Sequence, residues 1–173
     1  MLPVDESVAF ELAPEYLSIA YKVAAQSPDP SNQNGASLFS FDQQRRITGY
    51  NHFPAGIEVT EELLQDRDRK LMFIEHAERD LVARAAFRGI SLYNSVVYCP
   101  WFACAECARM LALAGVKLIV GHQPRMDTTP ESWRASVDAG NHILDKAGVK
   151  RLYYGEPLNL DFTIKVNKTD WQP

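Results

Sequence analysis

The sequence lacks long hydrophobic runs, an excess of positive charge and a large number of cysteines. Because no stretch approaches the roughly 18 apolar residues of a transmembrane helix, we expect no membrane span. With 18 Lys and Arg against 22 Asp and Glu, the net charge of -4 argues against a protein that coats long nucleic acid, since such proteins present a basic face. The 3 cysteines do not make a disulfide framework, and no internal repeat or low-complexity segment is present.

The other bulk properties are those of an ordinary globular protein. The chain has 173 residues, 46% of them apolar and 23% charged, so its length fits one domain with a full core. Residues 1–6 contain neither the basic nor the apolar region of a signal peptide, and we therefore expect a cytoplasmic protein. A small phosphorylated ligand stays compatible with the acidic net charge, because a few local cations or helix N-termini can hold one phosphate.

Hydrophobic periodicity and turn residues divide the chain into helices and strands. Apolar residues at spacings of three and four predict helices over 14–26, 74–88, 105–114 and from about 130 to 147. Short apolar runs between turn residues predict strands over 35–41, 46–50, 95–99, 117–120 and 149–154, and a weaker strand or extended tail over 158–166. The first two strands should form a hairpin around residues 42–44. Strands that alternate with helices after residue 74 predict a three-layer α/β domain.

A polar and highly charged segment runs from residue 51 to about residue 70. It has no clear period apart from a short helical pattern over 59–65. Long connections of this kind within a compact domain are often functional, so this segment is expected to cover a site.

The most informative motif is His76-Ala77-Glu78, followed 28 residues later by Cys104-Ala105-Glu106-Cys107. A catalytic zinc keeps three protein ligands and leaves one position open for water. Cys104 should lie at the start of a helix and Cys107 one turn further on, where free backbone N–H groups favour thiolates. His76 lies near the start of the preceding helix. The spacing therefore predicts a Zn2+ ion held by His76, Cys104 and Cys107.

Glu78 supplies a carboxylate that need not bind the metal. It follows His76 by two residues, a rotation of roughly 200° around a helix. Zinc lowers the pKa of bound water toward about 7, and Glu78 can take up the proton, pass it to a ring nitrogen and deliver a proton to departing ammonia. The combination H-x-E and P-C-x-x-C is the signature of zinc nucleobase deaminases, with one difference here, since Ala103 precedes the first cysteine.

Simpler interpretations of Cys-x-x-Cys are a structural zinc and a redox pair. A structural zinc usually has four protein ligands, and the third cysteine, Cys99, falls on an expected strand, where a buried thiol is the more common outcome. A thioredoxin-like pair would not need His-x-Glu upstream. The conjunction of both motifs therefore favours a catalytic zinc.

At these residues the chain resembles the cytidine and deoxycytidylate deaminase superfamily, in particular its deoxycytidylate branch. The resemblance covers about residues 14–155, leaves 156–173 as a C-terminal extension, and is carried by four stretches, at 27–36, 49–56, 74–79 and 100–108. It implies a three-layer α/β/α cytidine-deaminase-like fold with a five-stranded mixed sheet, and zinc at the ends of two adjacent helices. It also implies a homo-oligomer, either a dimer or a hexamer.

The resemblance assigns roles to residues outside the metal motif. Asn51 matches the asparagine that holds the sugar hydroxyl and the site of the base. The loop over 27–33 matches a phosphate-binding loop, in which Ser31 and Asn32 are the candidates, with Lys70 or Arg69 as additional cations.

Three further residues are candidates for contact with the base. Trp101 and Phe102 precede Cys104 and could line a base pocket, because aromatic walls suit a planar ring; packing of the cysteine loop is the alternative. Ala77, between the metal ligand and the carboxylate, is also assigned to substrate binding.

The predicted function is zinc-dependent hydrolytic deamination of a deoxycytidine nucleotide, first of all dCMP to dUMP and ammonia. Other substrates stay open because four residues depart from the family pattern: Pro28, Asn34, His52 and Ala103. They include a 5-substituted dCMP, cytidine or a free base such as guanine. A non-catalytic zinc-stabilised scaffold is the third alternative. The expected partner is a small-molecule nucleotide, without long nucleic acid or membrane.

Overall fold

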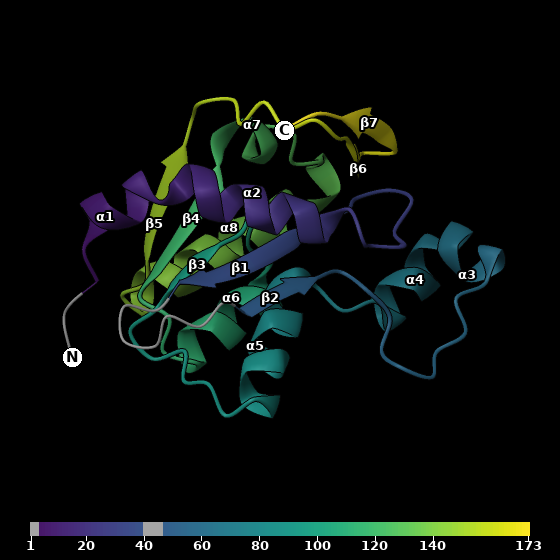
Figure 1. The fold of residues 1–173 in the computed structure, drawn as a ribbon. Helices are drawn as coiled ribbons and strands as arrows, with labels where there is room; N and C mark the ends of the chain where they lie inside the picture. Colours follow the sequence, from purple (N-terminus) through teal and green to yellow (C-terminus); the bar gives the residue numbers. More distant parts are fainter. Residues whose placement is uncertain (1–3, 40–46) are drawn as a thin grey trace.

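A five-stranded mixed sheet forms the centre of the protein, as the computed structural model shows for residues 4–39 and 47–173 (Figure 1). The strand order is β2-β1-β3-β4-β5. Strand β1 runs antiparallel to both of its neighbours, whereas β3, β4 and β5 are parallel. The strands are β1 (Gly35–Phe39), β2 (Ile47–Tyr50), β3 (Val96–Tyr98), β4 (Leu118–His122) and β5 (Lys150–Tyr154).

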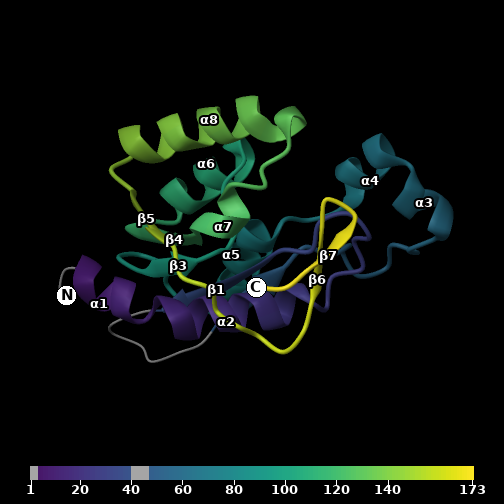
Figure 2. The ribbon, with the colours of Figure 1, turned by 90° about the horizontal axis from the view of Figure 1, so that it is seen from above.

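Helices cover both faces of this sheet (Figure 2). Helices α1 (Glu6–Glu11) and α2 (Ala13–Ala24) lie on one face, and α5 (Ala77–Phe87), α6 (Ala105–Leu113) and α8 (Glu131–Lys146) lie on the other. Side chains of β3 alternate between the two cores: Val96 and Tyr98 pack with α1 and α2, whereas Val97 packs with α5 and α6. The predicted three-layer α/β/α fold is thus confirmed.

The antiparallel hairpin of β1 and β2 is also confirmed. Gly35 pairs with Tyr50 and Leu38 pairs with Ile47. The turn that the sequence places at residues 42–44 lies outside the described residues.

The helix expected to begin at residue 74 begins instead at Ala77. Glu75 forms an antiparallel bridge with His52, which fixes residues 74–76 in an extended conformation. Ile74 fits the helical period but packs with Phe53 and Leu63 in a separate small cluster. The prediction was wrong at this boundary because tertiary contacts override the local pattern.

The segment between residues 51 and 73 folds into two short helices that extend away from the sheet (Figure 1). They are α3 (Glu61–Gln65), which the sequence indicated, and α4 (Arg67–Phe73), which it did not. Thr60 and Asp66 cap them by accepting hydrogen bonds from backbone N–H groups of the first turn. This segment therefore has fixed geometry where a loop was expected.

The C-terminal extension forms a hairpin of β6 (Ile164–Val166) and β7 (Thr169–Trp171). The expected strand over 158–166 is limited to its last three residues. Asn167 and Lys168 both have positive φ, as a two-residue turn of type I′ requires. Ile164 and Val166 pack against α2, which holds the hairpin on the body of the protein.

Two other helices were not expected from the sequence. They are α1 and α7 (Gln123–Met126), which directly follows β4. Among the helices of the described residues, none combines the length and the apolar character that crossing a bilayer demands.

Gly49 allows α5 to lie directly on β2. A Cβ at this position would lie 2.4 Å from the Ala77 carbonyl oxygen and 2.5 Å from the Leu81 nitrogen, both of them backbone atoms that cannot rotate away. The substitution Gly49→Ala is therefore expected to destabilise the protein by about 2 kcal/mol or more, measured by denaturant unfolding.

Gly155→Ala is the matched control, because a Cβ there meets nothing within 4 Å. Equal unfolding midpoints for the two variants would contradict the close contact between β2 and α5.

Candidate active site

The candidate metal ligands lie where two helices begin. His76 is the N-cap residue of α5 and Cys104 is the N-cap residue of α6, and both have extended backbone conformations. Neither side chain forms a capping hydrogen bond with its own helix, so both are available to a third group. Cys107 lies in the first turn of α6, as the spacing predicted.

The distances among these three side chains suit zinc. His76 Nδ1 lies 3.5 Å from the Sγ of Cys104 and 3.5 Å from the Sγ of Cys107. With Zn–S near 2.3 Å and Zn–N near 2.0 Å, the sulfur-to-nitrogen edge of a tetrahedral site is about 3.5 Å. No fourth His, Cys, Asp or Glu joins the group within the described part of the chain, which leaves one position for another ligand. The donor set fits a catalytic zinc.

Cys99 is a buried thiol outside this group. Its Sγ contacts the Trp101 carbonyl oxygen at 3.3 Å, and the Asn34 side chain donates to it at 3.4 Å. The predicted packing role for this cysteine is confirmed.

Within the Cys104 and Cys107 pair, negative charge is favoured on one sulfur. The hydrogen bond from Cys107 is the main cause that lowers the pKa of Cys104 to about 3, against the opposite effect of burial. The same hydrogen bond, together with burial, raises the pKa of Cys107 well above its usual range. A cation between the sulfurs would stabilise both as thiolates.

Contacts around the ligands fix the two helix starts relative to each other. Arg79 of α5 forms ion pairs with Glu75, just before its own helix, and with Glu106 of α6. On the other side, Gly140 of α8 approaches the Ala103 carbonyl so closely that a Cβ would lie 2.2 Å away. The backbone of Ala103, where the family motif usually has proline, is thus fixed by packing.

Glu78 lies in the first turn of α5 and is 3% exposed. Burial is the main cause that raises the pKa of its carboxyl group to about 7, while His76 lowers it. A carboxyl group in this range can both accept and donate a proton near neutral pH.

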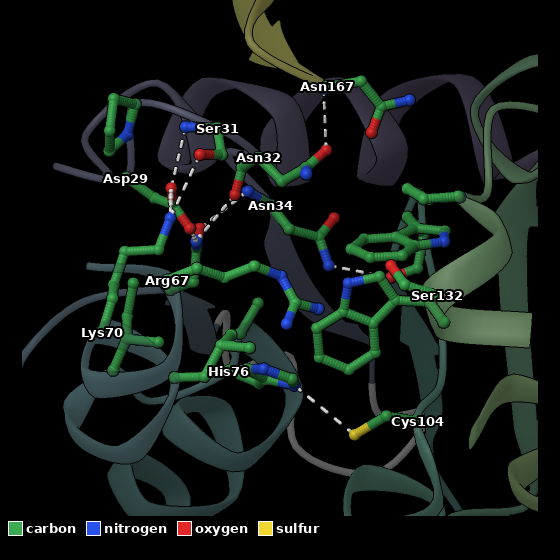
Figure 3. Close-up of a pocket in the computed structure, with 18 of the residues that line it drawn as sticks. Asp29, Ser31, Asn32, Asn34, Arg67, Lys70, His76, Cys104, Ser132 and Asn167 are labelled. Atoms are coloured by element: carbon green, nitrogen blue, oxygen red, sulfur yellow. Dashed lines mark hydrogen bonds and ion pairs between the residues drawn. The ribbon is translucent and has the colours of Figure 1, made fainter. Parts of the chain in front are cut away.

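A cavity of about 470 Å³ opens in front of these groups (Figure 3). This volume is in the range of small-molecule sites. In Figure 3 the loop residues Ser31, Asn32 and Asn34 lie on one side of the cavity, and His76 and Cys104 lie on the other. Its lining includes all the predicted site residues except Cys107: Ser31, Asn32, Asn51, His76, Ala77, Glu78, Trp101, Phe102 and Cys104.

Asn51, which directly follows β2, holds the loop over 29–34 in place through hydrogen bonds. Its Oδ1 accepts a hydrogen bond from the Asn34 backbone at 2.7 Å, and its Nδ2 donates to the Asn32 carbonyl at 2.8 Å. The residue lines the cavity, so it can also meet a ligand through the second lone pair of Oδ1.

Lys70 of α4 reaches the same loop, whereas Arg69 does not. The Lys70 Nζ lies 2.7 Å from Asp29 Oδ1 and 3.2 Å from Ser31 Oγ, and the side chain is buried. Arg69 lies at the surface beside Glu62, 3.7 Å away, and does not line the cavity.

The structure adds residues to the cavity that the sequence did not single out for it. They come from α4, from α8 and from the C-terminal hairpin, and include Arg67, Ser132, Trp133, Asn167 and Lys168. Trp133 packs edge-to-face on Trp101 with ring centroids 5.8 Å apart, and 5.6 Å from the His76 ring. The helical period of the sequence placed Trp133 on the apolar face of its helix. That period alone could not show that this face borders the cavity.

Residues 11–123, more than half of the chain, match the family model of the cytidine and deoxycytidylate deaminase zinc-binding region. The chain therefore belongs to this family, and the range contains both metal motifs.

Individual relatives agree with this assignment. The deoxycytidylate deaminase of Mus musculus is 31% identical over 118 residues, which cover 62% of this chain and 62% of that protein, so less than two thirds of its length is matched. The Homo sapiens enzyme of the same name is 29% identical over 147 residues, covering 79% of this chain and 76% of that protein.

Solved structures share the fold. The dCMP deaminase of cyanophage S-TIM5 in its apo form superimposes with a TM-score of 0.60 at 21% identity, over 83% of this chain and 98% of that one. A second structure of that enzyme, in complex with dCMP and dUMP, gives a TM-score of 0.61 at 20% identity, with coverage of 83% and 97%.

Cys104→Ala is expected to lose zinc and stability together, because two remaining ligands hold the ion weakly and its binding energy is also folding energy. Metal analysis of the purified protein and its thermal unfolding would measure both. Cys99→Ala, which removes a thiol outside the group, should keep its zinc. Full zinc content in Cys104→Ala would remove this residue from the ligand set.

Proposed function

We propose that this chain, acting as one domain over 1–173, is a zinc-dependent hydrolase that converts dCMP to dUMP and ammonia. The observation that carries the proposal is that His76, Cys104 and Cys107 lie at distances suited to zinc, and that His76 and Cys104 line the same cavity as Glu78. Three ligands, an open position and a nearby carboxyl group are the parts that hydrolytic deamination needs.

The chemistry divides between the metal and Glu78. Zinc, when held by the three ligands, supplies a Lewis acid that brings the pKa of water toward about 7. Glu78 accepts a proton from the attacking water and passes it to the ring nitrogen next to the amino-bearing carbon. It then takes the remaining proton from the hydroxyl group added to the ring carbon and donates it to the amino group, which leaves as ammonia. Because the carboxylate is regenerated between these steps, one residue serves both.

The remaining cavity residues suit a pyrimidine nucleotide. Trp101, Phe102 and Trp133 provide aromatic surface for a planar ring. Asn51 and Ala77 are proposed to contact the sugar and the base, and Ser31 and Asn32 the phosphate.

Relatives support the choice of a nucleotide. The mouse and human proteins are named deoxycytidylate deaminases, and the phage dCMP deaminase was solved with dCMP and dUMP. At this level of identity the substrate of the present chain is a proposal. The homo-oligomer expected from the family resemblance also stays a prediction.

The scaffold alternative does not explain Glu78. Burying a carboxyl group away from water costs free energy, and a structural zinc with its own ligands has no need of it. A proton carrier must lie next to the reacting atoms, so its burial follows from the proposed reaction.

Glu78→Gln keeps the shape of the side chain but cannot carry the proton. We expect zinc content and unfolding temperature to stay close to the unmodified protein, and kcat to fall by about 100- to 10,000-fold. Ammonia release from dCMP measures the loss. Glu156→Gln, at an exposed carboxylate, is the control with unchanged kcat. Unchanged turnover in Glu78→Gln would exclude the proton-carrier role.

A substrate panel tests the nucleotide assignment. Zinc-loaded protein is expected to release ammonia from dCMP with a kcat/KM at least about tenfold above that for deoxycytidine, because a phosphate contact contributes more than 1 kcal/mol. The panel also contains 5-methyl-dCMP, 5-hydroxymethyl-dCMP, cytidylate, cytosine, guanine and adenosine. Turnover of only a nucleoside or a free base would keep the zinc chemistry and discard the phosphate assignment.

A further inference from the structure

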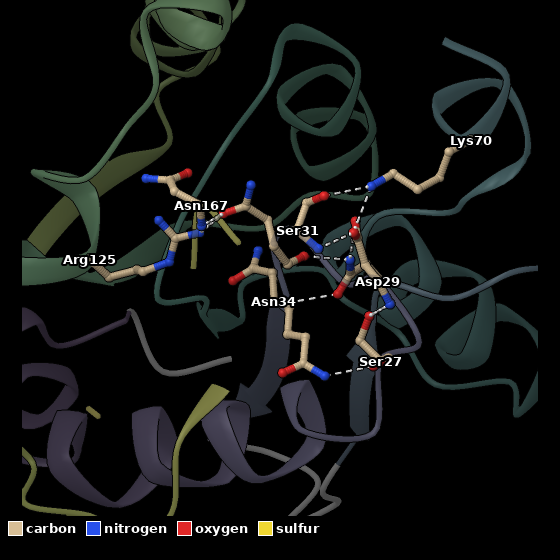
Figure 4. A network of polar contacts seen from close by, with 10 residues as sticks. Ser27, Asp29, Ser31, Asn34, Lys70, Arg125 and Asn167 are labelled. Atoms are coloured by element: carbon tan, nitrogen blue, oxygen red, sulfur yellow. Dashed lines mark hydrogen bonds and ion pairs between the residues drawn. The ribbon is translucent and has the colours of Figure 1, made fainter. Parts of the chain in front are cut away.

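A network of polar side chains connects the loop over 29–34 to Lys70 of α4, Arg125 of α7 and Asn167 of the C-terminal hairpin (Figure 4). It contains one carboxylate, Asp29, and two cations, Lys70 and Arg125. Lys70 and Asp29 form an ion pair at 2.7 Å. Arg125, at the other end of the network, forms no ion pair with any residue that the structure describes. The network therefore carries one positive charge without a counter-ion.

Arg125 lies on α7, two residues beyond the range that matches the family model. Its side chain is 0% exposed. One guanidinium nitrogen donates to Asn32 Oδ1 at 3.0 Å and the other donates to Thr128 Oγ1 at 2.6 Å, whereas Nε has no partner within the described residues. The guanidinium carbon lies 4.6 Å from the centre of the Trp101 ring.

The titratable neighbours of Arg125 do not compensate its charge. They are Tyr21 and Cys99, and burial raises the pKa of both groups, so both are neutral at pH 7. Burial also lowers the pKa of Arg125 to about 10, which still leaves it positively charged at neutral pH. A buried cation without a counter-ion is costly, and such groups are concentrated at functional sites.

Arg125 does not line the cavity itself, but its positive charge lies directly behind residues that do. Two of its three contacts, Asn32 and Trp101, line the cavity. Asn32 Oδ1 accepts hydrogen bonds from Arg125 and from the Asn167 backbone, both at 3.0 Å, so its amide group has a fixed orientation. Its Nδ2 forms no hydrogen bond with the other described residues and remains available to donate to a ligand oxygen.

We propose that Arg125 is the positioning residue that makes this cavity select a phosphate-bearing substrate over the uncharged nucleoside. It orients the Asn32 amide toward the ligand and supplies the positive charge that the ligand's phosphate compensates. This inference rests on the proposed deamination of a nucleotide. Arg67 and Lys168, which are both exposed, also line the cavity, but salt screens exposed charges much more than buried ones.

The first test is Arg125→Met, which removes the charge and keeps an unbranched side chain of similar length. We expect the preference for dCMP over deoxycytidine to fall by roughly 10- to 100-fold, mostly through a higher KM for dCMP. The kcat/KM for deoxycytidine should stay within about twofold, a result that general damage to the fold would not give. Arg88→Met, at the exposed arginine that caps the C-terminus of α5, is the control for net charge.

Two further variants separate charge from packing. Arg125→Lys keeps the charge and should keep most of the dCMP preference. If Arg125→Lys loses the preference as fully as Arg125→Met does, the effect lies in packing and the proposal is overturned. Asn32→Asp places a carboxylate against Arg125 and should raise the unfolding temperature, because it supplies the missing counter-ion. A lower unfolding temperature would show that the charge is already compensated, which also overturns the proposal.

A binding measurement distinguishes this inference from the proposed function. Inorganic phosphate and dUMP should raise the unfolding temperature of the unmodified protein, deoxyuridine should do so less, and Arg125→Met should abolish the phosphate effect. If phosphate stabilises the unmodified protein but not Arg125→Met, and no compound of the panel is deaminated, the inference is kept and the proposed function is rejected. If the unmodified protein and Arg125→Met both deaminate dCMP, and both prefer it over deoxycytidine to the same degree, the proposed function is kept and the inference about Arg125 is rejected.

Discussion

The meeting of two helix N-termini is the constraint on which the rest of the site depends. His76 and Cys104 come from separate helices, yet their ligand atoms lie 3.5 Å apart. A shift of one helix by a fraction of an ångström would change the coordination distances, which vary little between zinc sites. The surroundings are accordingly rigid: Arg79 bridges the two helix starts, and backbone contacts at Gly49 and Gly140 leave no space for adjustment.

The second part of the site, the loop over 29–34, is held mainly by polar contacts. Asn51, Lys70 and Arg125 approach it from three different elements, and each forms hydrogen bonds with it. The candidate metal site and the loop over 29–34 thus differ in the interactions that hold them in place. Close backbone packing at Gly49 and Gly140, together with the ion pairs of Arg79, maintains the first. A hydrogen-bond network with an excess positive charge maintains the second.

The sequence predicted the candidate metal ligands because their pattern is local. Cys104 and Cys107 are separated by one helical turn, and helix starts can be recognised from neighbouring residues. The hairpin and the alternation of strands and helices could be predicted for the same reason, whereas the mixed sheet was expected from the family resemblance. The start of α5 could not, since His52, distant in the chain, holds Glu75 extended. Arg125 and Asn167 gave no signal either: they meet Asn32 across 93 and 135 residues of sequence, and no local period encodes such a contact.

The C-terminal hairpin has a consequence for the order in which the site is completed during translation. Its backbone donates to the Ser31 carbonyl from Lys168 and to the Asn32 side chain from Asn167. Both candidate metal motifs are translated before these residues. The hydrogen bonds that hold the loop over 29–34 against the hairpin can therefore form only after every candidate metal ligand has been made.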